Sequence, residues 1–157
     1  MQISVNNQKI SIKTKQATIT MNDNLKINDF EVSGPGEYEV GGVMVYGLTK
    51  GGYVLKDEEF GFCWLVNRDE EIDEKKLEDL PDVEILFITL SDDLNKDLKN
   101  IKIIEPKIIV PAGGPERIKE FIEKEGNVER VDGNLKITRM SLPLDGQKIY
   151  IFNNGSD

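Results

Sequence analysis

Histidine is absent from the 157 residues of this chain, and cysteine occurs once, at Cys63. Without an imidazole, the chain cannot build the histidine sites on which most catalytic zinc centres and most nucleophilic triads depend. A lone cysteine excludes an internal disulfide, and its apolar neighbours Phe62 and Trp64 predict a buried thiol. The longest apolar runs have strand length, far below the ~20 residues of a membrane span. Since the first residues also lack a signal-peptide pattern, we expect a cytoplasmic protein with no membrane contact.

The composition is that of an acidic globular domain. The formal net charge of −9 disfavours nucleic acid as a partner, because phosphate binding needs a basic surface. At this length the chain can bury one real hydrophobic core. We expect a single domain over residues 1–152 and a disordered tail over residues 153–157.

Strand patterns fill the first half of the chain. Apolar and polar residues alternate with period two in six segments: 10–14, 17–21, 30–32, 38–40, 43–46 and 53–56. The next segment, 62–66, is apolar throughout, which predicts a strand that is covered on both faces.

Helices and strands alternate after residue 67. Asp73 is placed to cap a helix over residues 74–80, and a second helix is expected to begin at Ser91 with Asp92 and Asp93 in its first turn. Pro115 opens a third helix that Gly126 ends. Strands are expected over residues 83–88, 108–111, 135–138 and 148–152. This order predicts an α/β (α+β) fold with a two-sheet αββα sandwich, or else a simpler α+β domain.

One segment favours the two-sheet sandwich over the simpler α+β domain. The sequence GPGEYEV at residues 34–40, followed by Gly42 and Val43, closely resembles a segment of the small lactonase-like, zinc-dependent hydrolases of the metallo-β-lactamase superfamily. Three further stretches, 63–67, 73–88 and 105–111, resemble later strands and a helix of that family in the same order. The resemblance implies a truncated metallo-β-lactamase-like αββα sandwich with mixed β-sheets flanked by helices.

The metal ligands that this resemblance implies are missing. The family's His-x-His-x-Asp-His loop would fall within residues 22–29, which contain no histidine. Asn67 stands where the bridging aspartate is expected, and Gly113 stands where the later histidine is expected. A catalytic zinc needs about three protein ligands and an open position for water. We therefore predict a degenerate member of the superfamily with no catalytic residue, no bound metal and no cofactor.

Carboxylate side chains are the remaining candidates for cation binding or acid–base catalysis. Asp92 and Asp93, or the acidic run 69–71, could supply oxygen ligands to Mg²⁺ or Ca²⁺. Glu37 and Glu39 project from one strand face and could act as an acid–base pair. A helix start and a solvated surface explain these carboxylates equally well.

A glycine pair marks a possible anion site. Gly113 and Gly114 precede a helix with Arg117 in its first turn, so free N–H groups and a guanidinium could bind phosphate or carboxylate. An ordinary turn is the alternative.

The leading interpretation is a structural or protein-interaction module that self-associates or binds another protein, because a shortened fold exposes surface that a lost segment once covered. A binding module for a small anion and a metal-independent hydrolase are the alternatives.

Overall fold

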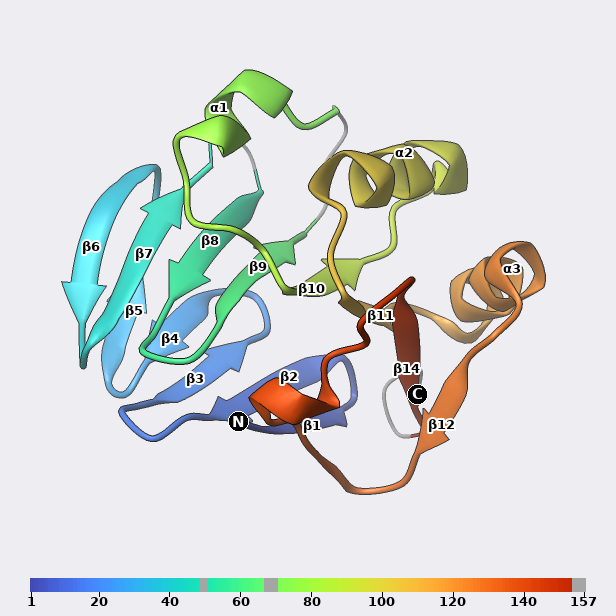
Figure 1. The fold of residues 1–157 in the computed structure, drawn as a ribbon, viewed down its shortest axis with the longest axis horizontal. Coiled ribbons are helices and arrows are strands. Elements are labelled where there is room, and N and C mark those ends of the chain that lie inside the picture. The colour runs from blue at the N-terminus through green and yellow to red at the C-terminus, as the bar shows by residue number, and fades with distance from the viewer. Residues whose placement is uncertain (49–50, 67–70, 154–157) are drawn as a thin grey trace.

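The computed structural model describes residues 1–48, 51–66 and 71–153, which form two sheets and a layer of helices (Figure 1). The first sheet has six strands in the order β13-β1-β2-β3-β4-β5, and every pairing in it is antiparallel. Its strands are β1 (Gln2–Asn6), β2 (Lys9–Lys13), β3 (Thr18–Met21), β4 (Leu25–Ile27), β5 (Phe30–Val32) and β13 (Asn134–Lys136).

The second sheet has eight strands in the order β12-β14-β11-β10-β9-β8-β7-β6. Strands β6 to β9 pair antiparallel, whereas β9, β10, β11, β14 and β12 run parallel. The strands are β6 (Gly36–Val40), β7 (Val43–Gly47), β8 (Gly52–Lys56), β9 (Gly61–Leu65), β10 (Ile85–Thr89), β11 (Ile108–Ala112), β12 (Glu129–Val131) and β14 (Lys148–Phe152).

The helices lie on one side of the molecule. They are α1 (Glu74–Glu78), α2 (Leu94–Ile104) and α3 (Pro115–Glu125), with a short 3-10 turn, η1 (Arg139–Ser141), near the first sheet. Ile101 of α2 and Phe121 of α3 pack on the outer face of the eight-stranded sheet. Within the described ranges, no helix covers the outer face of the six-stranded sheet (Figure 1). None of the described helices is long and apolar enough to cross a membrane.

Alternate side chains of the first strands point inward and build the hydrophobic core between the two sheets. Ile10 and Ile12 of β2 are buried while Lys9 and Lys13 point outward, and β1, β3 and β4 repeat this pattern. The inward residues meet the inner face of the other sheet, where Phe62 and Phe87 pack edge to face with ring centroids 6.3 Å apart. The fold class and the order of strands before strand–helix units are therefore confirmed.

Some of the predicted helix and strand boundaries are confirmed, and others are wrong. Strand β9 is buried on both faces as predicted, Asp73 caps α1, Pro115 begins α3 and Gly126 ends it. The predicted helix start at Ser91 is wrong, because Asp93 is the N-cap and α2 begins at Leu94. Strands β1, β4 and β12 were not among the predicted strands. Of the predicted disordered tail, residues 154–157 lie outside the described part of the chain.

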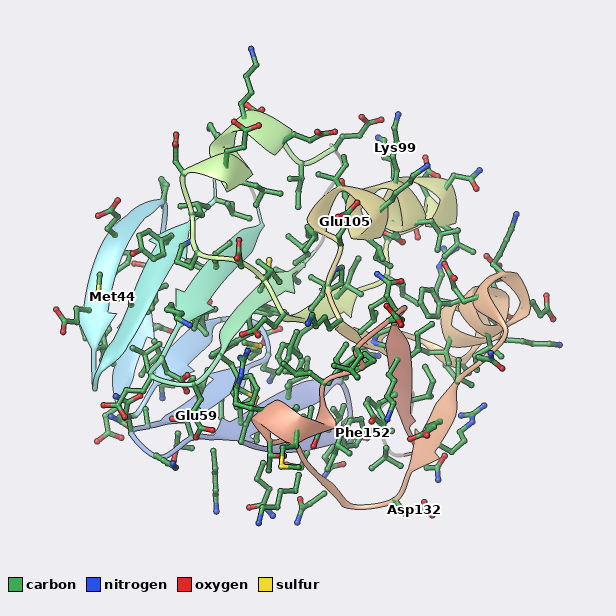
Figure 2. All side chains as sticks on the ribbon, in the orientation of Figure 1. Met44, Glu59, Lys99, Glu105, Asp132 and Phe152 are labelled. Carbon is green, nitrogen blue, oxygen red and sulfur yellow. The ribbon has the colours of Figure 1, made fainter. Side chains whose placement is uncertain are left out.

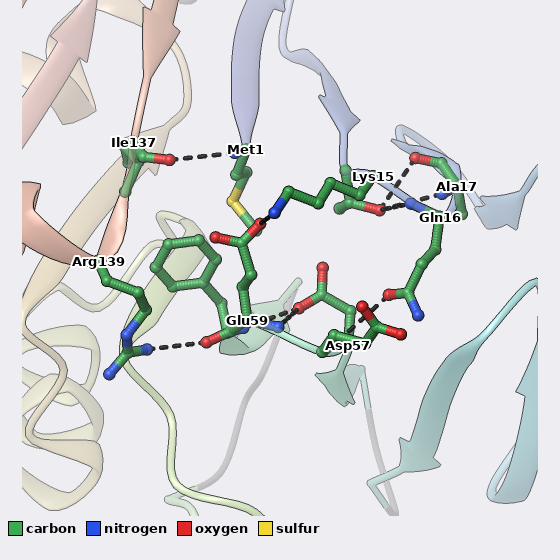
Figure 3. Close-up of polar contacts among 11 residues, drawn as sticks. Met1, Lys15, Gln16, Ala17, Asp57, Glu59, Ile137 and Arg139 are labelled. Atoms are coloured by element: carbon green, nitrogen blue, oxygen red, sulfur yellow. Dashed lines mark hydrogen bonds and ion pairs between the residues drawn. The ribbon is translucent and has the colours of Figure 1, made fainter.

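A polar network joins the two sheets at one edge (Figure 3). The Asp57 carboxylate accepts hydrogen bonds from the backbone N–H groups of Glu59 and Phe60, which fixes the turn between β8 and β9. Glu59 then pairs with Lys15 of the β2–β3 turn at 3.6 Å, and its carbonyl accepts from the Arg139 guanidinium at 2.8 Å. The turn is thereby held by both the first sheet and η1.

Gly61 marks the tightest backbone approach at this edge. Its carbonyl accepts from Glu84 N–H at 2.8 Å, and its own N–H donates to the Glu84 carboxylate at 3.1 Å. A Cβ at Gly61 would lie 1.9 Å from the Asp82 carbonyl oxygen, which is backbone and cannot move aside cheaply.

We expect Gly61→Ala to destabilise the protein by about 3 kcal/mol or more, because the clash forces β9 and the entry to β10 apart. Urea unfolding measures the change. Gly114→Ala is the matched control, since a Cβ there meets nothing within 4 Å, and it should cost no more than about 1 kcal/mol, the loss of a favourable N-cap residue. Equal stability of the two variants would contradict the close approach.

Candidate functional site

The parallel strands β9, β10 and β11 end at the same edge of the eight-stranded sheet, where folds of this layered type place their chemistry. Val66, Leu90 and Gly113 follow the three strand ends. None of these residues has a metal-binding side chain. Asn67, the predicted position of a lost ligand, lies outside the described residues.

A buried carboxylate lies behind this edge. Asp97 of α2 is only 3% exposed, and its two oxygens accept hydrogen bonds from the Ser91 backbone N–H and hydroxyl, both at 2.9 Å. Burial raises the pKa of Asp97 above its ordinary value of 3.8, and the Ser91 hydrogen bonds oppose part of the rise. The neighbouring Asp93 raises this pKa further and Arg117 lowers it. Asp97 thus closes the β10–α2 loop by accepting both donors of Ser91.

The structure brings together the residues of the predicted anion site, but its cationic group already pairs with a carboxylate of the chain. Gly114 is the N-cap of α3, and a Cβ at Gly113 would lie 3.6 Å from the Cβ of Arg117. The Arg117 guanidinium donates to the exposed carboxylate of Asp92 at 2.5 Å. A carboxylate of the chain itself therefore satisfies the cation that an incoming anion would use.

The other predicted carboxylate sites also have structural roles. Asp93 accepts from Lys96 N–H as the cap of α2, and Glu71 pairs with Lys99 at 2.7 Å; Figure 2 shows Lys99 projecting from α2. Residues 69 and 70 of the acidic run lie outside the described part of the chain. Glu37 and Glu39 lie on one face of β6 as predicted, and both are exposed to solvent.

A cavity of about 340 Å³ opens between the sheets beside the interval where the resemblance expects a metal loop. Asp23 and Asn24 line one side, and Tyr53 and Trp64 line the other, with their rings stacked at 6.3 Å. Burial raises the pKa of Tyr53, and the nearby Tyr38 adds to the rise. Asn24 is engaged by Glu31, to which its amide donates at 2.6 Å.

These donors do not fit a catalytic zinc. The cavity wall offers one carboxylate, Asp23, and the nearby strand ends offer none. Among the residues that the structure describes, no three His, Cys, Asp or Glu side chains are grouped to hold a metal. The only cysteine is buried within β9. The described residues therefore do not form the ligand set that the resemblance implies.

Sequence reasoning missed a second cleft, of about 730 Å³, at the opposite edge of the sheet. Glu59 and Glu105, both labelled in Figure 2, line it. Lys56 and Lys107 line it as well. Arg139 reaches it from η1, pairs with Glu84 at 2.5 Å and lies over the Phe60 ring at 5.3 Å. No sequence pattern joins these residues, because they come from segments that are far apart in the chain.

The raised pKa of Asp97 predicts a pH effect. The native state binds a proton at Asp97 more tightly than the unfolded state does. The stability that this protonation contributes is fully present below the pKa that Asp97 has in the unfolded state. It is lost as the pH rises through the pKa that Asp97 has in the native state. Wild type should therefore gain stability relative to Asp97→Asn as the pH falls from about 7 to about 4.

Urea unfolding at both pH values tests this expectation, with Asp145→Asn, at an exposed loop position, as the control. A wild-type advantage that stays constant, or grows toward neutral pH, would contradict it.

One of three comparisons with known proteins finds a match, and it concerns the fold. No protein-family model and no curated protein matches the chain. A solved structure from Thermotoga maritima, assigned to the Zn-dependent hydrolases of the metallo-β-lactamase superfamily, superposes with a TM-score of 0.77 over 97% of this chain and 99% of that one. The two sequences are 15% identical, so the likeness shows the fold alone. The chain has a metallo-β-lactamase fold, as the resemblance of its residues predicts, without the grouped metal ligands among its described residues.

Proposed function

We propose that this chain is a non-catalytic protein of metallo-β-lactamase fold that acts through contacts with other proteins. The observation that carries the proposal is the donor set at the carboxyl ends of the parallel strands. Val66, Leu90 and Gly113 occupy these ends, and the whole chain has no histidine. A catalytic zinc needs about three protein ligands that hold it and lower the pKa of its water.

The anchoring of nearby polar groups supports the same proposal. Asp97 is held by Ser91, and Arg117 is held by Asp92, so these groups stabilise loops rather than face a substrate. A small anion at Gly113, Gly114 and Arg117 is the second candidate, and it would have to displace Asp92. A hydrolase that works without metal is the third. The Ser91 hydroxyl and the Asp97 carboxylate, 2.9 Å apart, are the pair described above that it could use, but Asp97 is only 3% exposed.

We expect purified protein to contain far less than one zinc per chain after exposure to excess zinc and dialysis, measured by elemental analysis. Lactone and phosphodiester substrates should be hydrolysed no faster than in buffer. Stoichiometric zinc, or turnover that a chelator abolishes, would overturn the non-catalytic assignment. Turnover that survives the chelator would favour the metal-independent hydrolase.

Self-association is the second part of the proposal. Two large apolar side chains near η1, Met140 and Leu144, are 96% and 97% exposed, although the adjacent Leu142 is buried. Exposed apolar groups of this size are often covered by a second copy through a two-fold contact. The segment 138–146 is therefore the surface that we assign to self-contact.

Met140→Asp combined with Leu144→Asp should shift the protein from dimer to monomer in light scattering at high concentration. Each change places a charge where an apolar contact is expected, and neither residue supports the core. Asn95→Asp combined with Asn127→Asp adds the same charge at exposed positions and should leave the dimer intact. A wild-type protein that is monomeric at every concentration would refute this part.

A further inference from the structure

The six-stranded sheet has an outer face that no described helix covers (Figure 1). Strand alternation fixes its composition, because every second residue of β1 to β4 is buried in the core. We call this surface the basic face and define it by the outward residues of its strands. These are Gln2, Ser4, Asn6, Lys9, Ser11, Lys13, Thr18, Thr20, Lys26, Glu31, Asn134 and Lys136.

The charge of the basic face is opposite to that of the protein. It carries four lysines and one glutamate, whereas the whole chain has a net charge of −9. The cross-strand register places Gln2 between Lys13 and Lys136, and Thr20 between Ser11 and Lys26. The sequence hides this asymmetry, because the lysines come from β2, β4 and β13, and β13 is more than 100 residues away from the other two.

The lysines of the basic face are available. None of Lys9, Lys13, Lys26 and Lys136 forms an ion pair with any residue in the described part of the chain, and all four are exposed. Glu31 lies opposite Lys26 in the register but accepts a hydrogen bond from Asn24 instead. No residue in the described ranges therefore neutralises the positive charge of this face by an ion pair.

We propose that the basic face binds the acidic surface of a partner protein. This inference deepens the proposed interaction role by naming the partner's chemistry, and it rests on that role. Lys136 and Lys26 lie four strand spacings apart, about 19 Å, and the longest strands of this sheet, β1 and β2, are about 17 Å long. This surface is smaller than the ~800 Å² that each partner buries in a standard interface. It therefore suits the charged part of a weak, transient contact.

Other occupants fit this face less well. It has no outward aromatic side chain on which a nucleobase could stack, and no apolar side chain to enter a membrane, among the strand residues that define it. Two copies joined by this face would set like charges against each other. Charge complementarity therefore favours a different, acidic protein.

The test uses fluorescent poly-L-glutamate as the probe and measures its binding by anisotropy. Wild type should bind at low salt and lose affinity as the Debye length falls from ~30 Å at 0.01 M to ~8 Å at 0.15 M. The triple variant Lys9→Glu, Lys13→Glu, Lys26→Glu should bind at least about tenfold more weakly, because like charges replace the attraction.

A matched control separates the basic face from net charge. Lys75→Glu, Lys119→Glu, Lys124→Glu makes the same total change on exposed positions of α1 and α3 and should bind within about twofold of wild type. Circular dichroism checks that the variants fold. If the glutamate triple variant is unfolded, Lys9→Gln, Lys13→Gln, Lys26→Gln provides the milder comparison.

Three outcomes would overturn the inference: no binding by wild type at low salt, equal loss in both triple variants, or tighter binding of a thymidine oligonucleotide to the same face. None of them bears on zinc content, so the non-catalytic assignment is tested separately by elemental analysis.

Discussion

Apolar contact between the two sheets is the constraint on which the rest of the structure depends. Every second residue of the first strands is buried against the inner face of the eight-stranded sheet. Strands β9, β10 and β11 are buried on both faces, because the helices cover the other side. A change of one residue in register would turn lysines inward and isoleucines outward, so the pairing is strongly specified.

At the edge of the sheet where this layered fold places its chemistry, the described residues group no three metal-binding side chains. Parallel strands deliver three chain segments to one edge, and in this protein those strands are followed by valine, leucine and glycine. The polar groups nearby, Ser91 with Asp97 and Asp92 with Arg117, satisfy one another and fix the loops. The core lies in the sheets and not in these loops, so the stability of the scaffold comes from layer packing.

The same packing decides how charge is distributed over the surface. Lysine alternates with isoleucine in β2, so one strand supplies both the core and a positive outer face. Acidic residues collect elsewhere, at the helix starts and in the turns, where they cap backbone N–H groups as Asp73 and Asp93 do. A strongly acidic protein thereby keeps one face of opposite charge, which its overall charge does not reveal.

The sequence by itself determined the fold class, most strands, three helix boundaries and the absence of imidazole, because periodicity, caps and residue identity are local properties. It also identified the scaffold from the GPGEYEV segment, which forms β6 and the turn before it. Only the tertiary structure decided that Arg117 is held by Asp92, that Arg139 meets Glu84, and that lysines from separate strands share one face. These contacts join residues far apart in the chain, and their geometry follows from strand register and layer packing, which no local pattern encodes.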